Sequence, residues 1–275
     1  MLTDAHLHLC EYSDGDVIDV LESARNQGVM RFVTAALDAD TAALDHRRAE
    51  AYGNDVVRVV GVHPWRADTA DKESCDRLRS IIQGSVQVVG IGEIGLDTVR
   101  GGHARSVQLR ALDAMLGLAE ESRKPVLLHA DRISEHDHRS LLGIVAERRI
   151  RSGVVHGFAA DRAIAEAWLR TGFLLSFSGS VTWSENAWLR DIAALVPADR
   201  LLTESDSPAA YEPESARGST NAPKFVRSTL NVLSQIRKML PEQLEEQIAA
   251  NLSSVFPFGD ERTDKGGGED AGQSC

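Results

Sequence analysis

Short apolar runs alternate with stretches of helical periodicity along most of the chain, and this pattern constrains the fold more than any other feature. The runs are rich in Val, Ile and Leu, and they lie at residues 2–9, 31–36, 56–62, 86–92, 125–129, 153–156, 172–177 and 200–204. Predicted helices separate them at 15–27, 40–52, 71–82, 105–122, 137–149, 161–170 and 186–195, and a longer helical stretch covers about 223–253. Continuous rather than alternating apolar runs are typical of a parallel sheet that helices cover. Eight strand–helix units therefore predict an α/β fold, a closed (β/α)8 TIM barrel.

A doubly wound open sheet is the alternative α/β architecture. Such a sheet carries a Gly-rich phosphate loop after its first strand, and this chain has none there. Gly90 and Gly92 are followed by Glu93 instead of the start of a helix. We therefore predict one barrel domain over residues 1–258. Residues 259–275 are acidic and Gly-rich with nothing apolar to pack, so we expect them to form a disordered tail.

The charge balance excludes one class of function. Thirty basic against 41 acidic residues give a net charge of −11, whereas a protein that coats nucleic acid would be basic. A nuclease is not excluded, because divalent ions at its site supply the local positive field. Three scattered cysteines, no secretory pattern and no apolar run of about 18 residues lead us to expect a cytoplasmic protein that does not enter a membrane.

Two histidines lie close together in the run LTDAHLHL at residues 2–9. Side chains two apart on a strand point to the same side, so the imidazoles of His6 and His8 share a face. Two buried imidazoles are costly unless each has a partner, and a metal ion is the most economical partner. On its own, a His-x-His pair is equally compatible with a structural role.

Residues with metal-binding side chains recur where other predicted strands end. In a (β/α)8 barrel the active site lies at this C-terminal end of the strands. Five of the nine histidines fall there. The candidate metal ligands are His6, His8, Glu93, His129, His156 and Asp206. His63 also ends a strand, and we assign it to substrate contact or to filling the barrel mouth rather than to metal binding.

The candidate ligands combine imidazoles with carboxylates. Such a mixture suits zinc or manganese, whereas magnesium favours more oxygen ligands and more water. Six ligands exceed what one tetrahedral ion with an open position needs, and they suit two ions that share a bridging carboxylate. Two such ions generate hydroxide and clamp both oxygens of a displacement at phosphorus. We therefore predict two divalent metal ions per chain, which are Mg, Mn or Zn.

Several motifs resemble those of the TatD family of metal-dependent deoxyribonucleases, within the wider amidohydrolase-type barrels. They are DAHLHL at 4–9, GVHP at 61–64, GIGEIGLD at 90–97, KPVLLHA at 124–130, VVHGF at 154–158, LLSFSG at 174–179 and LLTESDSP at 201–208. Arg217, followed by NAP at 221–223, is a further match. The resemblance covers roughly residues 2–258 in order, and it is more specific for the family than for the substrate.

The resemblance implies that one metal ion is held by His6, His8, Glu93 and Asp206 and a second by Glu93, His129 and His156. Asp206 would also orient or deprotonate the attacking water, so Asp206 and Glu93 are the implied catalytic residues. The implied reaction is hydrolysis of phosphodiester bonds, a 3′–5′ exonuclease activity on single-stranded DNA. We expect single-stranded DNA or a small phosphoester as the binding partner, and we treat the chain as a monomer without assigned protein partners.

The loops around the ligands depart from the family pattern. TatD-type chains have His-x-Arg or His-x-Lys after the fifth strand, whereas here ADR at 130–132 follows His129. The aromatic residues common after the fourth strand are replaced by TVRGGH at 98–103. The residues that we predict to contact substrate are His63, Trp65, Arg132 and Arg217. Trp65 and Trp183 lie in loops at the catalytic face and are candidates for stacking on a base.

Two other interpretations stay open. One is a metal-dependent amidohydrolase, lactonase or deacylase acting on a small substrate, although such barrels often bridge their metals with a modified lysine where this chain has Glu93. The other is a metal-binding partner protein without catalysis, against which the complete set of ligands argues. Away from the site, we expect Trp168 to pack in the core and His138 to lie in a solvated helix start.

Overall fold

Eight parallel strands follow one another around a single sheet in the order β1 to β8. The computed structural model describes residues 1–131, 133–209 and 211–259. Its strands are β1 (Leu2–Leu7), β2 (Val29–Ala35), β3 (Val56–Val60), β4 (Val88–Gly95), β5 (Val126–His129), β6 (Gly153–His156), β7 (Leu174–Phe177) and β8 (Leu201–Thr203). A parallel bridge joins Leu7 at the end of β1 to Ser207 after β8, and the amide of Asp206 donates to the carbonyl of His6 over 2.9 Å. The sheet therefore closes, and the predicted (β/α)8 barrel is confirmed.

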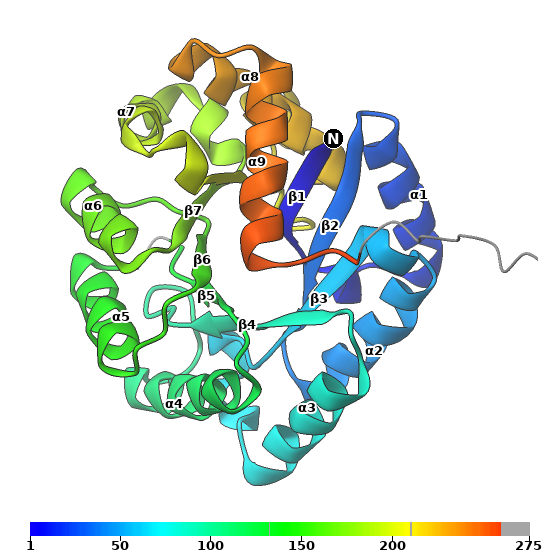
Figure 1. Ribbon diagram of the computed structural model, residues 1–275, viewed down its shortest axis with the longest axis vertical. Helices are drawn as coiled ribbons and strands as arrows, with labels where there is room; N and C mark the ends of the chain where they lie inside the picture. Colours follow the sequence, from blue (N-terminus) through cyan, green and yellow to red (C-terminus); the bar gives the residue numbers. More distant parts are fainter. Residues whose placement is uncertain (132, 210, 260–275) are drawn as a thin grey trace, which may run out of the picture.

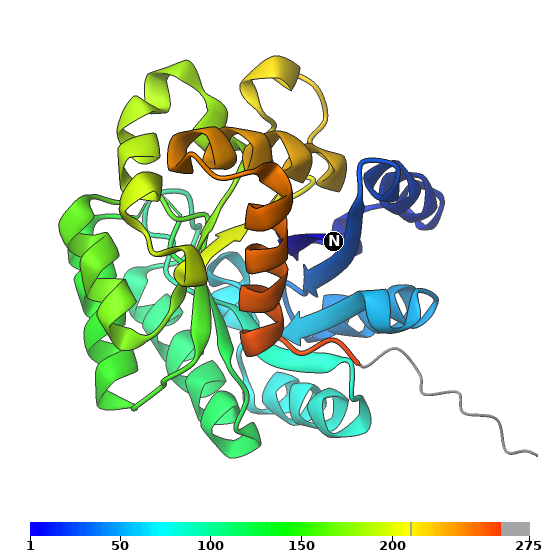
Figure 2. The same cartoon turned by 45° about the horizontal axis from the view of Figure 1, so that its top comes forward.

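Helices surround the barrel, and the last of them lies across one end of it (Figure 1). A view turned by 45° shows the helices around the strands (Figure 2). They are α1 (Asp14–Arg25), α2 (Ala39–Glu50), α3 (Lys72–Gly84), α4 (Arg105–Ser122), α5 (Glu135–Glu147), α6 (Arg162–Thr171), α7 (Ala187–Leu195), α8 (Val226–Arg237) and α9 (Pro241–Val255). Several begin after a residue whose side chain accepts a hydrogen bond from the first turn, as Ser13, Asp71 and Ser134 do. Such N-caps stabilise a helix by about 1 kcal/mol and are visible in the sequence. Within the described ranges, no helix has both the length and the apolar character needed to cross a bilayer.

The longer helical stretch predicted at about 223–253 is helical over most of its length, and the structure divides it into two helices. α8 ends at Arg237, and Lys238 caps it with a left-handed φ of 54°. Pro241 then begins α9. Proline lacks an amide hydrogen and its ring clashes with a preceding turn, so it starts a helix rather than continuing one. The predicted tail falls outside the described residues, apart from Gly259.

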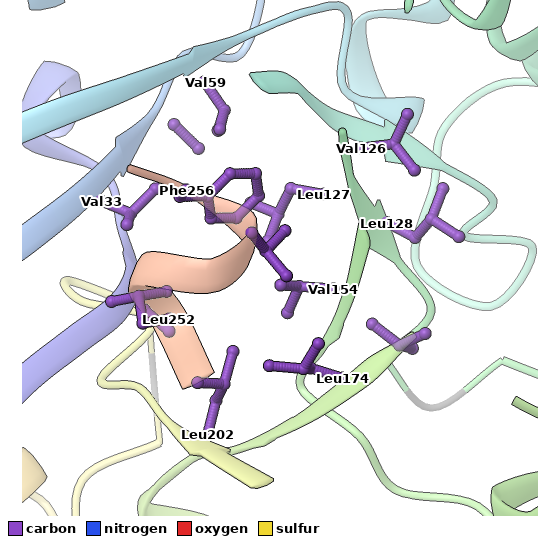
Figure 3. Close-up of a cluster of buried hydrophobic side chains, with 14 of the residues drawn as sticks. Val33, Val59, Val126, Leu127, Leu128, Val154, Leu174, Leu202, Leu252 and Phe256 are labelled. Atoms are coloured by element: carbon purple, nitrogen blue, oxygen red, sulfur yellow. The ribbon is translucent and has the colours of Figure 1, made fainter. Parts of the chain in front are cut away.

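α9 closes the end of the barrel at which the strands begin. Leu252 of this helix and Phe256 just after it point among the valine and leucine side chains of the strands (Figure 3). Nδ2 of Asn251 donates to the carbonyl of Leu201, at the start of β8, over 2.9 Å. A Cβ atom at Gly90 would lie 2.6 Å from the ring of Phe256, so glycine is what leaves room for this ring. The side chains that can do chemistry gather at the opposite end.

Candidate metal centre

The six side chains predicted as metal ligands come together at the C-terminal end of the barrel. They are His6 in β1, His8 just after it, Glu93 in β4, His129 and His156 at the ends of β5 and β6, and Asp206 after β8. None is more than 6% exposed. Strands that are far apart in the sequence supply them, because parallel strands around a barrel bring their C-terminal ends to one rim.

Glu93 lies at the centre of the cluster, and its two carboxylate oxygens face different histidines. Oε2 is 3.2 Å from Nε2 of His6 and 3.3 Å from Nε2 of His8. Oε1 is 2.6 Å from Nε2 of His156 and also contacts Nδ1 of His129. A carboxylate with one oxygen toward each of two imidazole pairs has the geometry of a bridge between two cations.

Asp206 joins the imidazoles on the Oε2 side of Glu93. Its Oδ1 is 3.3 Å from Nε2 of His6 and 3.6 Å from Nε2 of His8. Within the described part of the chain, Nε2 of His6 and Oε2 of Glu93 have no hydrogen-bond partner, although both are buried. Unpaired polar atoms are costly in a protein interior, and a divalent cation between them would satisfy both. The donors present therefore fit a metal ion.

His63 belongs to the same cluster, although sequence analysis left it out of the ligand set. It follows β3 and is buried, with Nε2 3.4 Å from Oε1 of Glu93 and 3.3 Å from Nδ1 of His129. These three residues form a group that could hold an ion. Burial lowers the pKa of His63 to about 4 and outweighs the opposing effect of Glu93, so the imidazole is neutral and keeps a lone pair. The signal was present in the sequence, since His63 ends a predicted strand as other candidates do.

Two further carboxylates orient the ligand imidazoles from behind. Nε2 of His129 is 3.5 Å from Oδ2 of Asp97, and Nδ1 of His156 is 3.4 Å from Oε1 of Glu204. Asp97 and Glu204 are both fully buried. Such partners hold a metal-binding imidazole in one tautomer and one orientation. Sequence reasoning missed both residues, because their role appears only in contacts between residues at the ends of different strands.

The charges at the centre attract a cation. Burial raises the pKa of Glu93, but the surrounding imidazoles, with His156 foremost, bring it well below its usual range. Burial also raises the pKa of Asp206, and the adjacent imidazoles of His6 and His8 more than reverse this effect. Both carboxylates are therefore ionised, and they concentrate negative charge where the imidazole nitrogens converge.

The two tryptophans proposed for base stacking differ in how much ring they expose. Trp65 lies in a 3-10 turn, η3 (Pro64–Thr69), and is 44% exposed. Its Nε1 donates to Oδ2 of Asp97 over 2.8 Å, which ties the ring to the outer layer of the centre. Trp183 instead packs against Tyr211, with ring centroids 6.3 Å apart, and against the guanidinium of Arg217. Trp65 is therefore the better candidate for a nucleobase.

Of the two arginines predicted to contact substrate, the structure describes only Arg217. Arg217 forms ion pairs with Glu185 at 2.5 Å and with Glu214 at 3.6 Å. Its positive charge is therefore paired with carboxylates in the loops after β7 and β8. Arg132 lies outside the described residues, so its assignment stays a prediction.

His138 is buried, which contradicts the expectation of a solvated helix start. It lies in the first turns of α5 and accepts a hydrogen bond from Nε1 of Trp168 over 3.3 Å. Trp168 is fully buried, as predicted. The helical period explains the error, because His138, Leu141 and Val145 share the inward face of α5. Burial lowers the pKa of His138 to about 4.

Acid is expected to destabilise the fold through His138. The unfolded chain takes up this proton near pH 6.5, whereas burial holds the pKa in the folded state to about 4. Below pH 6.5 the unfolded state therefore binds more protons, and stability falls as the pH decreases toward 4. Between pH 7 and pH 5 the loss is about 1–2 kcal/mol. Urea unfolding of the wild type and of His138→Gln at both pH values measures it, and an identical pH dependence of the two proteins would contradict it.

A parallel barrel that gathers imidazoles and carboxylates at the C-terminal ends of its strands defines the class of metal-dependent hydrolase barrels. The chain matches the family described as TatD related DNase over residues 3–257. It belongs to this family, and the resemblance inferred from the sequence motifs is confirmed.

Individual relatives agree with this assignment. The chain is 33% identical over 263 residues to the uncharacterized metal-dependent hydrolase YcfH of Escherichia coli strain K12, covering 93% of this chain and 95% of the relative. It is 31% identical over 246 residues to the 3′-5′ ssDNA/RNA exonuclease TatD of Pantoea vagans, covering 86% and 92%. Among solved structures, the TatD homologue YJJV from Escherichia coli K12 matches with a TM-score of 0.84 and 27% identity over 93% of this chain and 97% of that one. The chain is thus a metal-dependent hydrolase of the TatD family.

Proposed function

We propose that the chain is a two-metal hydrolase that removes nucleotides from the 3′ end of single-stranded DNA. The observation that carries the proposal is the geometry of Glu93, whose oxygens face His6 and His8 on one side and His129 and His156 on the other. The family description is a DNase, and the relative from Pantoea vagans is named as a 3′-5′ exonuclease of ssDNA and RNA. Both names support a phosphodiester substrate.

The proposed ligands of one ion are His6, His8, Glu93 and Asp206, and those of the second are Glu93, His129 and His156, with His63 adjacent. The donor set suits zinc or manganese, and magnesium is the third candidate. Two such ions, when bound, neutralise the phosphate and lower the pKa of a water molecule toward neutrality.

Asp206 is the proposed proton acceptor for the attacking water. Its carboxylate is ionised, because the adjacent imidazoles of His6 and His8 keep its pKa low despite burial. Asp97 holds His129 in place from behind. In this proposal Asp206 orients and deprotonates the water, and Asp97 positions His129. Proton transfer by a positioned side chain contributes about 100- to 10,000-fold to the rate of enzymes.

The other two interpretations have less support. Amidohydrolase barrels often bridge their metals with a modified lysine, and here the bridging position belongs to Glu93. A catalytically silent protein has no need for a complete set of buried, convergent donors. A cytoplasmic location rests only on the sequence features and stays a prediction.

A time course on single-stranded DNA labelled at its 5′ end tests the proposal directly. With manganese or magnesium added, we expect a ladder that shortens from the 3′ end. EDTA should stop the shortening, and excess metal should restore it. Intact DNA after incubation with a protein shown to contain its metal ions would contradict the nuclease proposal. Internal cuts without a 3′ ladder would contradict the exonuclease assignment.

Replacing Trp65 by Ala is expected to raise KM for single-stranded DNA about fivefold to a hundredfold, because stacking of one base on an aromatic ring contributes about 1–3 kcal/mol. Trp65→Phe should retain most of the affinity, since it keeps an aromatic face while it loses the hydrogen bond to Asp97. Trp188→Ala is the matched control, because Trp188 in α7 has a similar exposure of 46%. An unchanged KM in Trp65→Ala would remove the stacking hypothesis.

A further inference from the structure

Arg100 lies beside the candidate metal centre and is held by two buried carboxylates. It belongs to the loop between β4 and α4. Its Nη2 donates to Oδ2 of Asp131 over 2.7 Å, and its Nε is 3.3 Å from Oδ2 of Asp97. Its Nη1 donates to the hydroxyl of Tyr211 over 2.9 Å. Both carboxylates are almost completely buried, whereas the side chain of Arg100 is 37% exposed.

One residue connects this guanidinium to the centre. The Asp97 oxygen that faces Arg100 also lies 3.5 Å from Nε2 of His129 and accepts the hydrogen bond from Trp65. The guanidinium carbon of Arg100 is 5.8 Å from the centroid of the Trp65 ring. Arg100 is therefore next to a proposed metal ligand and next to the ring proposed to stack on a base.

The loop holds Arg100 in position before any substrate arrives. The amides of Val99 and Arg100 donate to Oδ1 of Asp97 over 3.2 Å and 2.7 Å. The backbone of the loop and the tip of the side chain are thus anchored to the same carboxylate. A group that is already ordered pays little conformational entropy when it binds a ligand.

Arg100 has hydrogen-bond donors to spare. A guanidinium carries five N–H groups, and in the described part of the chain two of them donate to Asp131 and Tyr211, while Nε lies within ion-pair distance of Asp97. One N–H group on each terminal nitrogen is left. The exposed third of the side chain can present these two donors to a ligand. Tyr211 donates to the same Asp131 oxygen, so these two residues occupy the parallel pair of N–H groups at the end of the guanidinium. The two remaining N–H groups lie on opposite edges, and each can donate one charge-assisted hydrogen bond to an anionic oxygen. In a chain with a net charge of −11, a positioned cation at this rim would add to the positive field of the metal ions for an anionic substrate.

We propose that Arg100 is a specificity-determining residue that binds the phosphate group next to the bond that is hydrolysed. The assignment of DNA as the molecule that carries this phosphate rests on the proposed function. The recognition itself depends only on an anionic, tetrahedral group adjacent to the metal centre.

A substrate with one neutral linkage tests the contact. We would compare oligothymidylate with the same oligomer carrying a methylphosphonate at the linkage next to the scissile bond. The wild type should lose about tenfold to a hundredfold in kcat/KM on the neutral linkage. Arg100→Met should show the same loss on the natural oligomer and no further loss on the methylphosphonate. If Arg100→Met discriminates between the two oligomers as strongly as the wild type does, the proposal is wrong.

Arg105→Met controls for the loss of a structural ion pair. Arg105 is 36% exposed, and its Nε is 2.7 Å from Oδ1 of the buried Asp137, so it matches Arg100 in exposure and in having a buried carboxylate as partner, although Arg100 has two. It begins α4 and has no assigned role in the site. Arg105→Met should discriminate between the two oligomers as the wild type does. The discrimination by Arg100→Lys, which keeps the charge but not the planar set of N–H groups, should be intermediate between those of the wild type and Arg100→Met. If Arg100→Met and Arg105→Met discriminated equally between the two oligomers in kcat/KM, the proposal would be overturned.

A binding measurement separates this proposal from the proposed function. If the metal-loaded wild type hydrolyses no DNA, the exonuclease assignment fails, and the affinity for thymidine 5′-monophosphate still tests Arg100. Calorimetric titration should then show about tenfold weaker binding to Arg100→Met than to the wild type, with equal metal contents and unfolding transitions. Equal affinities of the two proteins would exclude Arg100 as the phosphate-binding residue.

Discussion

A Glu93→Gln variant should lose its metal ions and hydrolyse DNA about a thousandfold more slowly, or worse. Glutamine keeps the shape of the side chain but removes the charge that faces His6 and His8 through one oxygen and His156 through the other. A neutral amide is a poor bridge between two cations. Metal ions in such a site contribute several kcal/mol to the stabilisation of the transition state, about three orders of magnitude in rate. Mass-spectrometric metal analysis and initial rates measure the two effects.

Asp45→Asn is the matched control for this experiment. Asp45 is also fully buried, and it accepts a hydrogen bond from Oγ1 of Thr34 over 2.9 Å. Burial raises its pKa to about 7, so the amide replaces a carboxyl group that is readily neutral. Because Asp45 lies on α2, outside the ligand set, the variant should keep its full metal content. An undiminished metal content in Glu93→Gln would show that Glu93 is not the bridge.

An Asp206→Asn variant should keep metal but lose about 100- to 10,000-fold in kcat, because asparagine retains an oxygen near His6 and cannot accept a proton. KM for single-stranded DNA should change little, since the phosphate and base contacts remain. Steady-state kinetics together with metal analysis distinguish the two roles of this residue.

Three results would each contradict this prediction in a different way. A lower metal content with an unchanged kcat per bound ion would make it a ligand and nothing more. An unchanged kcat at full metal content would exclude it as the proton acceptor. Wild-type cleavage by Asp206→Ala, which lacks both functions, would reveal a contaminating nuclease.

The barrel and the gathering of the candidate ligands could be predicted from residue order, because both depend on rules that apply to each strand separately. An apolar run between helices predicts a parallel strand, and a polar residue at its end predicts a place at the active rim. His129 and His156 could be assigned to one site in this way, although 27 residues separate them. In the structure their nitrogens are 3.0 Å apart.

Interactions between loops could not be predicted in the same way. The departures from the family pattern after β4 and after β5 were visible as two unrelated changes, and the structure shows that they form one ion pair, between Arg100 and Asp131. His63 was visible as a strand-end residue, but its distance from Glu93 depends on the rotamers of both side chains. His138 is buried because it lies on the same face of α5 as Leu141 and Val145. Its immediate neighbours in the sequence are polar, so the run looked solvent-exposed.

By itself the sequence determined the order of strands and helices, the rim at which the polar side chains gather, and the family. These follow from the periodicity of apolar residues and from local motifs, which each segment carries on its own. Only the tertiary structure decided which oxygen of Glu93 faces which histidines, that His63 joins them, and that Asp97 connects Arg100 to the centre. Contacts of a few ångströms between distant segments depend on strand register and side-chain rotamers together, and no local pattern encodes that combination.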